Sequence, residues 1–332
     1  MLSFLLVVLG VFLAAASLLA LTLLVYVPPL ARGFVQTSWL VAPPSPRLRG
    51  GETCRFRARD GIELSGVYLR TPAAQRMGVV VFCHELTSDR NSAGPYVEVL
   101  RRRGFDVFAF DFRNHGASAN LPGYEPLPWL TRFELADVQG ALDYVCSRPD
   151  ADPRGVGLMG VSRGGTAALA AAAGERRVRA VVTDGAFAFR TIQLHYMRRY
   201  MQIYTAWADW FARLPDLWLG PLCVWSQWVI GYRRGCRFVP IESAARRIRQ
   251  PVLMIHGADD PYIPLDTAAR LQTQLGGRSK LWVVPAARHN GSIVTAPSAY
   301  HRHVVRFFLK HLAHGRRAPA RRSERKTARA LA

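Results

Sequence analysis

The residues around Ser162 have the types and the spacing needed for nucleophilic chemistry. Gly160, Ser162 and Gly164 fit the pattern G-x-S-x-G, between an apolar run at 156–159 and a helix-forming run at 166–173. A serine on a sharp strand-to-helix turn has a strained backbone, so its neighbours two positions away must lack bulk. The first N–H groups of the helix would point to where an oxyanion forms. An ordinary glycine-rich turn fits the same pattern, so catalysis has to be judged from the rest of the chain.

A base and an acid for this serine are expected in two loops that follow predicted strands. A serine nucleophile needs a base to take its proton and an acid to orient that base. The apolar run at 252–256 leads into a loop with Asp259 and Asp260, and the run at 281–284 leads into a loop with His289. In a parallel sheet these loops lie at C-terminal strand ends, where sites form. The first loop is therefore expected to supply the acid and the second the base.

Short apolar runs separated by helical segments predict the scaffold that would position these loops. Two alternating runs, at 53–59 and 62–69, meet at Asp60-Gly61, which is a strong hairpin signal. A capping box at 131–134 opens one of the helices. The alternation predicts an α/β fold with a mostly parallel central sheet and helices on both faces. Further strands are expected at 79–83, 107–111 and 180–184, and further helices at 95–103 and 298–311.

The segment at about 188–247 interrupts this alternation between two predicted strands. It is rich in aromatic residues with arginines interleaved, so we expect an inserted helical cap. The aromatic side chains either pack inward as a structural cap or also line an apolar pocket or touch lipid, and the two interpretations are compatible. These aromatic residues include Tyr196, Tyr200, Tyr204, Trp207, Trp210, Trp218, Trp225, Trp228 and Tyr232.

The N-terminal residues predict a membrane anchor. Residues 2–27 carry no charge, and at ~1.5 Å per residue such a helix covers the ~30 Å hydrocarbon core. We expect a transmembrane helix at 1–27 and a proline-rich juxtamembrane linker at 28–50. A cleaved signal peptide is the alternative, but this run exceeds the roughly 7–15 residues of a signal peptide's apolar region. Basic residues follow the span, so the positive-inside rule predicts a single-pass protein whose catalytic domain is cytoplasmic.

The composition favours a membrane surface over nucleic acid as the partner of the basic residues. The net charge is +21, carried mostly by arginine. No zinc finger, aromatic RNA-binding signature or basic heptad array accompanies this charge, so we expect no nucleic-acid partner. The Arg/Ala-rich tail at 315–332 is expected to be disordered and attracted to anionic lipid. Five scattered cysteines fit a reduced compartment.

The motifs together resemble the α/β-hydrolase superfamily, near its monoglyceride-lipase and serine-esterase-like branches. Residues 256–264 match that family's H-G-x-x-D-x-x-V-P, with Ile263 in place of Val. This match implies that Asp260 is the acid, and His289 fits the base, which follows the last strand in a loop of small residues. Asp259 and Asp184 remain rivals for the acid. Eight other histidines compete with His289, and of these His115 and His256 are expected to fix their own loops by hydrogen bonds.

A further motif extends the resemblance to roughly 51–314. Residues 111–118 resemble the family's D-x-R-G-H-G-x-S, with Asn114 in place of Gly. The resemblance implies an α/β-hydrolase fold in which Ser162 is the nucleophile.

The resemblance also implies an oxyanion hole formed by the backbone N–H groups of Leu86 and Arg163. Where family members have H-G-x, this chain has Glu85 in place of the glycine. An inward-pointing carboxylate would oppose the oxyanion, and pairing with Arg90, Arg113 or Arg163 would relieve that effect. Backbone donors survive such a change, so the departure bears on the substrate more than on the fold.

The sequence thus predicts a membrane-anchored serine hydrolase that acts on an ester, a thioester or an amide of an apolar acyl substrate. Its chemistry passes through an acyl-enzyme and needs no metal or organic cofactor. The alternative is a catalytically silent hydrolase-like domain that serves as an interaction module at the membrane. A third hypothesis, a binder of anionic polymers, would show a steep loss of affinity with salt.

Overall fold

The centre of the molecule is an eight-stranded sheet in a computed structural model that describes residues 1–35, 45–204, 213 and 216–313. The strands lie in the order β1-β2-β4-β3-β5-β6-β7-β8. The pairs β1/β2 and β2/β4 are antiparallel and the other neighbouring pairs are parallel, which confirms the expected mostly parallel sheet. The strands are β1 (Glu52–Arg57), β2 (Glu63–Leu69), β3 (Gly78–Cys83), β4 (Phe105–Phe110), β5 (Val156–Val161), β6 (Val178–Asp184), β7 (Val252–Gly257) and β8 (Ser279–Val284).

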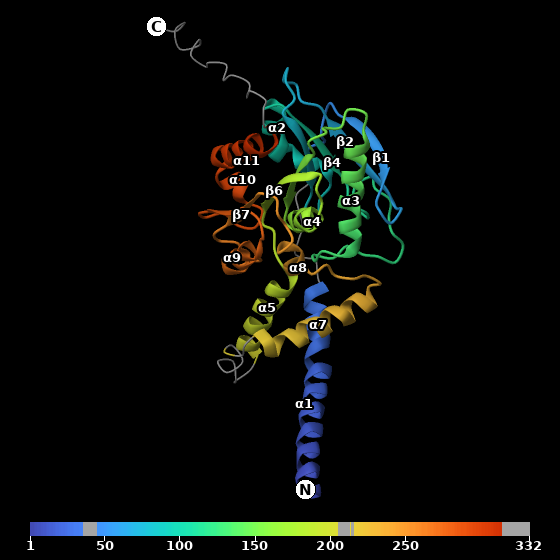
Figure 1. The fold of residues 1–332 in the computed structure, drawn as a ribbon, viewed down its shortest axis with the longest axis vertical. Helices are drawn as coiled ribbons and strands as arrows, with labels where there is room; N and C mark the ends of the chain where they lie inside the picture. Colours follow the sequence, from blue (N-terminus) through green and yellow to red (C-terminus); the bar gives the residue numbers. More distant parts are fainter. Residues whose placement is uncertain (36–44, 205–212, 214–215, 314–332) are drawn as a thin grey trace.

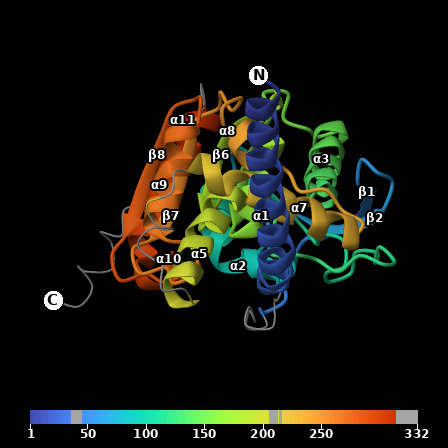
Figure 2. The ribbon, with the colours of Figure 1, turned by 90° about the horizontal axis from the view of Figure 1, so that it is seen from below.

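Helices cover both faces of this sheet, and each face carries its own apolar core (Figures 1 and 2). Side chains alternate along a strand, so Val79 and Val81 of β3 enter one core while Val80 and Phe82 enter the other. The first core is covered by α3 (Arg132–Ser147), α4 (Arg163–Ala172), α8 (Ile241–Ala245) and α9 (Leu265–Gln274). The second is covered by α2 (Gly94–Arg102), α10 (Ser292–Thr295) and α11 (Pro297–Leu312), and a short 3-10 helix, η1 (Arg90–Ala93), precedes α2.

Local sequence signals account for several ends of these elements. Strands β1 and β2 form the expected hairpin, and Gly61 adopts a φ of 93° in its turn. The capping box of α3 is also present, because Thr131 caps the helix and Glu134 accepts from the Thr131 backbone N–H at 3.0 Å. Glu134 accepts a second hydrogen bond from the Tyr124 hydroxyl at 2.7 Å. This glutamate is almost fully buried, so the cap belongs to the core.

Between β6 and β7 the chain forms α5 (Phe189–Tyr204), α7 (Asp216–Arg233) and α8, where the cap is expected. Helices α5 and α7 lie together on the side of the body from which α1 extends (Figure 1). The aromatic side chains there divide into two groups. Phe189 packs inward and stacks on Trp129 at 4.3 Å, whereas Trp225, Trp228 and Tyr232 on α7 are exposed and stack on one another at 5.2 and 5.8 Å.

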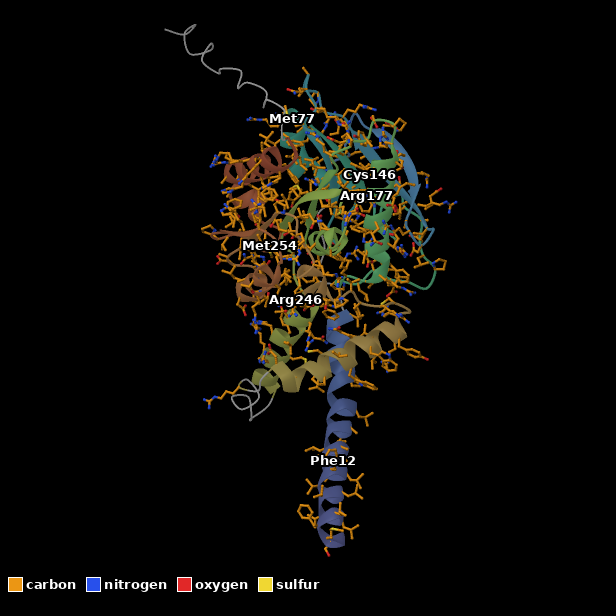
Figure 3. All side chains as sticks on the ribbon, viewed as in Figure 1. Phe12, Met77, Cys146, Arg177, Arg246 and Met254 are labelled. Carbon is orange, nitrogen blue, oxygen red and sulfur yellow. The ribbon has the colours of Figure 1, made fainter. Side chains whose placement is uncertain are left out.

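The N-terminal helix α1 (Leu2–Val35) contacts α7 and then extends away from the body (Figure 1). Figure 3 places Phe12 on the extended part of this helix, far from Met254 inside the body. The helix continues to Val35, so the beginning of the expected linker is helical. Val35 packs against a cluster that includes Tyr124 and Leu127, a long-range contact that a sequence pattern does not display. In the described part of the chain no helix combines the length and hydropathy needed to cross a membrane, so the transmembrane helix expected at 1–27 is not supported.

Several parts of the expected organisation lie outside the described residues. They are the middle of the linker at 36–44, the cap residues at 205–212 and 214–215 with Trp207 and Trp210, and the basic tail from 314 onward. The domain boundaries inferred from the sequence therefore stay predictions.

Gly140 allows α3 to approach the β-hairpin closely. A Cβ atom at this position would lie 2.4 Å from the carbonyl oxygen of Arg57 and 2.6 Å from the Cα of Ala58. Backbone atoms cannot rotate away, so we expect Gly140→Ala to lower the free energy of unfolding by roughly 1–3 kcal/mol in denaturant titrations. Gly94→Ala is the control, because its Cβ would meet only Leu48 at 3.8 Å. Equal stability of Gly140→Ala and wild type would contradict the close approach.

Candidate active site

Ser162 lies on the turn between β5 and α4. Its φ of 51° and ψ of −121° place it in a left-handed region that a side-chain-bearing residue rarely adopts, at a cost of about 1–3 kcal/mol. The Ser162 backbone N–H donates to the carbonyl oxygen of Asp184, the last residue of β6, at 2.7 Å. The turn therefore fixes the direction of the hydroxyl at the C-terminal edge of the sheet.

Two glycines give this turn the space that the sequence pattern requires. A Cβ atom on Gly160 would lie 2.4 Å from the carbonyl oxygen of Gly164. A Cβ atom on Gly164 would lie 2.3 Å from the carbonyl oxygens of both Cys83 and His84, at the end of β3. Any larger residue at either position would push the turn away from its neighbours. The steric argument made from the sequence thus matches the contacts on both sides of Ser162.

The structure brings the side chains of Ser162, His289 and Asp260 into one hydrogen-bonded chain. The distance from Ser162 Oγ to His289 Nε2 is 2.9 Å, and from His289 Nδ1 to Asp260 Oδ2 it is 2.6 Å. Since a carboxylate can only accept, His289 carries its proton on Nδ1 and its Nε2 accepts from the serine hydroxyl. In this arrangement Nε2 can receive the serine proton.

The surroundings of Asp260 favour its ionised form. Its Oδ1 accepts from the backbone N–H groups of Tyr262 and Ile263, each at 2.9 Å. Burial raises the pKa of Asp260, but the hydrogen bond and charge of His289 and these two amides outweigh it, so the net pKa is lowered. His256 bonds the carbonyl oxygen of Ile263 at 2.8 Å, and burial lowers its pKa. His256 therefore holds the loop that carries Asp260 by a hydrogen bond, as expected from the sequence. It does so as a neutral side chain.

The backbone N–H groups of Leu86 and Arg163 lie at the same edge of the sheet. Strands β3 and β5 are parallel neighbours with Cys83 opposite Gly160, so the loop after β3 runs beside the serine turn. Arg163 begins α4, where a helix leaves its N–H groups without an internal partner. Within the described residues, neither the Leu86 nor the Arg163 N–H is paired with an acceptor. Both are therefore available to an oxyanion.

The Arg163 side chain connects these two segments through His115. Its guanidinium lies 3.4 Å from His115 Nε2, and the same ring nitrogen contacts the carbonyl oxygen of Leu86. Glu134 lies 3.5 Å from the guanidinium, and both side chains are 1% exposed. Burial, followed by the Arg163 charge, lowers the pKa of His115 to about 4. A neutral His115 thus lies between the two segments that carry these N–H groups: its Nε2 donates to the Leu86 carbonyl oxygen and only packs against the guanidinium.

Glu85 is oriented toward a hydroxyl rather than toward an arginine. Ser92 Oγ donates to Glu85 Oε2 at 3.0 Å, and burial raises the pKa of this carboxyl group. In the described part of the chain the three arginines considered as partners bond elsewhere. Arg90 pairs with Asp111, Arg113 with Asp60 and Asp137, and Arg163 with Glu134.

The rival residues lie outside the hydrogen-bonded chain. Asp259 is exposed, whereas Asp184 is buried beside the serine turn and bonds Ser292. His301 contacts a carbonyl oxygen near α2, and His303 stacks on a tryptophan of β8. No group of three or more potential metal ligands occurs among the described residues.

Sequence reasoning missed two neighbours of His289. The ring of Tyr262 meets the His289 ring edge-on at 5.7 Å between centroids. Buried Ser292 donates to Asp184 Oδ1 at 3.0 Å. Tyr262 was recognisable as part of the acid loop. Ser292 gave no signal, because its partner is 108 residues earlier in the chain.

Comparisons with known proteins agree with this architecture. Residues 80–303 match the model of the alpha/beta hydrolase family. An uncharacterised protein of Escherichia coli O157:H7, YfhR, is 33% identical over 142 residues, which are 41% of this chain and 48% of YfhR. The chain thus spans about half the length of that relative. Thiohydrolase aneE of Aspergillus aculeatus is 31% identical over 130 residues, which are 39% of each protein. An esterase structure from Pyrococcus furiosus gives a TM-score of 0.61 at 19% identity over 82% of this chain and 98% of the esterase, a likeness of fold alone.

The depressed pKa of His115 predicts a loss of stability on acidification. Folding lowers this pKa from 6.5 to about 4, so between these values the unfolded chain binds a proton that the folded chain does not. Stability contributed by His115 is present above pH 6.5 and is lost as the pH falls toward 4. We expect the unfolding temperature of His115→Gln to fall less than that of wild type over this window, with His301→Gln on α11 as the control. Parallel pH curves for all three proteins would contradict the assignment.

Proposed function

The chain belongs to the alpha/beta hydrolase family, and we propose that it is a serine hydrolase that cleaves an ester, a thioester or an amide of an apolar acyl group. Ser162 is the nucleophile, His289 the general base and acid, and Asp260 the group that orients His289. The observation that carries this proposal is the hydrogen-bonded chain from Ser162 Oγ through His289 to Asp260.

The proposed reaction has two half-reactions. Ser162 Oγ attacks the acyl carbon while His289 Nε2 takes the hydroxyl proton, and the N–H groups of Leu86 and Arg163 bind the resulting oxyanion. Collapse of this intermediate breaks the bond to the leaving group, which takes the proton from His289 and departs. Water then attacks the acyl-enzyme with His289 again as base, and the free acid leaves as the serine recovers its proton. These steps need no metal or organic cofactor.

An apolar acyl group is the substrate that the surroundings of the site favour. Trp129, Phe187, Phe189 and Ile263 form one apolar cluster between the cap and the acid loop. Ile263 is also one of the residues whose N–H holds Asp260, so this cluster reaches the proposed catalytic residues. The relative named as a thiohydrolase keeps thioesters among the candidate substrates.

A fluorophosphonate probe tests the proposed nucleophile. Because labelling requires an activated serine, we expect wild type to be labelled and Ser162→Ala and His289→Ala to lose the label. Asp260→Asn should slow labelling by roughly 10³–10⁴-fold, since the histidine is then held in the wrong tautomer. Asp259→Asn and His301→Ala are matched controls and should be labelled at the wild-type rate.

The alternative, a catalytically silent domain, is favoured by Glu85 alone. Glu85 lies in the loop after β3, next to Leu86, and its carboxyl group has no arginine partner among the described residues. Folded wild-type protein that takes no label would support this alternative. Labelling of Glu85→Gly but not of wild type would identify Glu85 as the cause.

We also propose that the protein attaches to a membrane, with its catalytic domain on the cytoplasmic side. Apart from Ser3 and Ser17, the described side chains along 3–24 of α1 are apolar, and they are exposed; Phe12 is 75% exposed. Trp225, Trp228 and Tyr232 expose a second apolar surface on α7, which contacts α1. Such aromatic side chains favour the membrane–water interface, and the net charge of +21 favours anionic lipid.

Membrane extraction tests this attachment. We expect the full chain to sediment with membranes after a salt wash, because apolar contacts are not screened by salt, and to be released only by detergent. Replacing Trp225, Trp228 and Tyr232 with serine should weaken vesicle binding, whereas Ser298→Ala should not. Recovery of wild type in the supernatant of unwashed membranes would overturn the proposal. Cleavage of the catalytic domain by a protease added to the non-cytoplasmic side of sealed vesicles would overturn the cytoplasmic orientation.

A further inference from the structure

The end of β6 connects the serine turn to the loop that carries His289. The carbonyl oxygen of Asp184 accepts from the backbone N–H of Ser162 at 2.7 Å. The carboxyl group of the same residue accepts from Ser292 Oγ at 3.0 Å. Ser292 is fully buried and begins α10, three residues after His289. Asp184 is therefore hydrogen-bonded both to the turn that carries Ser162 and to the segment that follows His289.

Gly185, which follows Asp184, also lies close to His289. Gly185 adopts a φ of 68°, and a Cβ atom there would lie 3.3 Å from His289 Cε1 and 3.1 Å from Asn290 Oδ1. The His289 ring thus lies close to the backbone that follows β6, with little room for a side chain at position 185. A shift of this backbone would move the ring relative to Ser162.

The Asp184 carboxyl group is surrounded by polar side chains rather than by a paired cation. Ser292 on α10 and Tyr300 on α11 face it, Tyr96 on α2 lies near, and His289 and Asp260 act on it by charge. Asp184 Oδ2 and the Tyr300 hydroxyl are both buried, and neither has a hydrogen bond of good geometry among the described residues. The carboxyl group is fully buried, and this burial raises its pKa to about 7, against the opposing effects of the Ser292 hydrogen bond and the His289 charge.

We propose that Asp184 is a positioning residue that, through Ser292, holds the His289 loop in place against the serine turn. The proposal rests on the catalytic roles assigned above to Ser162 and His289. Asp184 touches no substrate and donates no proton in the reaction. Its carboxyl oxygen acts as the acceptor that fixes Ser292, and its backbone fixes Ser162.

This assignment separates the acceptor from the charge of Asp184. Asparagine keeps an oxygen that can accept from Ser292, and its amide can donate to the Tyr300 hydroxyl. It cannot ionise, so the activity that Asp184→Asn retains is due to the acceptor and not to a charge.

The test compares Asp184→Asn, Asp184→Ala, Ser292→Ala and the exposed control Ser298→Ala. With a p-nitrophenyl acyl ester as the substrate, we expect Asp184→Ala and Ser292→Ala to lower kcat by roughly tenfold or more and to change KM by less than about threefold, because His289 is misplaced while substrate contacts remain. Asp184→Asn should recover most of kcat, because it keeps the acceptor for Ser292. Equal losses in Asp184→Asn and Asp184→Ala, or full activity of folded Ser292→Ala, would overturn the proposal.

A second measurement keeps the inference testable if the protein proves catalytically silent. Amide hydrogen exchange in 286–296 reports the order of the His289 loop without any substrate. We expect faster exchange there in Asp184→Ala and Ser292→Ala, and wild-type exchange in Asp184→Asn and Ser298→Ala. Unchanged exchange in Asp184→Ala would overturn the positioning role, whereas absent probe labelling with the expected exchange pattern would overturn only the proposed function.

Discussion

The left-handed backbone at Ser162 is the constraint on which the arrangement of this site depends. A serine with a φ of 51° costs about 1–3 kcal/mol, and the surrounding backbone must hold it there. The end of strand β3 confines the turn on one side, since the carbonyl oxygens of Cys83 and His84 would lie only 2.3 Å from a Cβ atom on Gly164. Strand β6 does so on the other, because Asp184 accepts the Ser162 N–H. The strained turn is stable because its neighbours in the sheet permit no relaxed alternative.

Several buried charged side chains lie near the same edge of the sheet, and most of them are paired with a side chain of opposite charge. Arg113 lies between Asp60 and Asp137, and Arg163 lies beside Glu134. Removing one partner of a buried pair leaves an uncompensated charge and typically costs about 3–5 kcal/mol. These pairs connect the loop after β4 and the start of α4 to α3. They therefore link the segments that pack beside the serine turn.

The sequence predicted most of the scaffold because the relevant signals are local. Alternating apolar runs, the Asp60-Gly61 turn and the capping box of α3 each depend on residues a few positions apart, and all three were confirmed. The order of the motifs also predicted which loops would meet, and Ser162, His289 and Asp260 do lie within hydrogen-bonding distance. The orientation of Glu85 and the bond from Ser292 to Asp184 were beyond this reasoning, because both depend on how distant segments pack. The continuation of α1 to Val35 likewise depends on a tertiary contact.

The capping box of α3 has a consequence for how this chain can vary. In an ordinary capping box glutamate and glutamine are interchangeable, since either side chain accepts from the N-cap backbone. Here Glu134 also lies beside the guanidinium of Arg163, deep in the protein. A glutamine would preserve the helix start and leave a cation stranded next to the serine turn. Positions 134 and 163 are therefore expected to vary only as a pair, so the start of α3 is constrained by the serine turn as well as by its own helix.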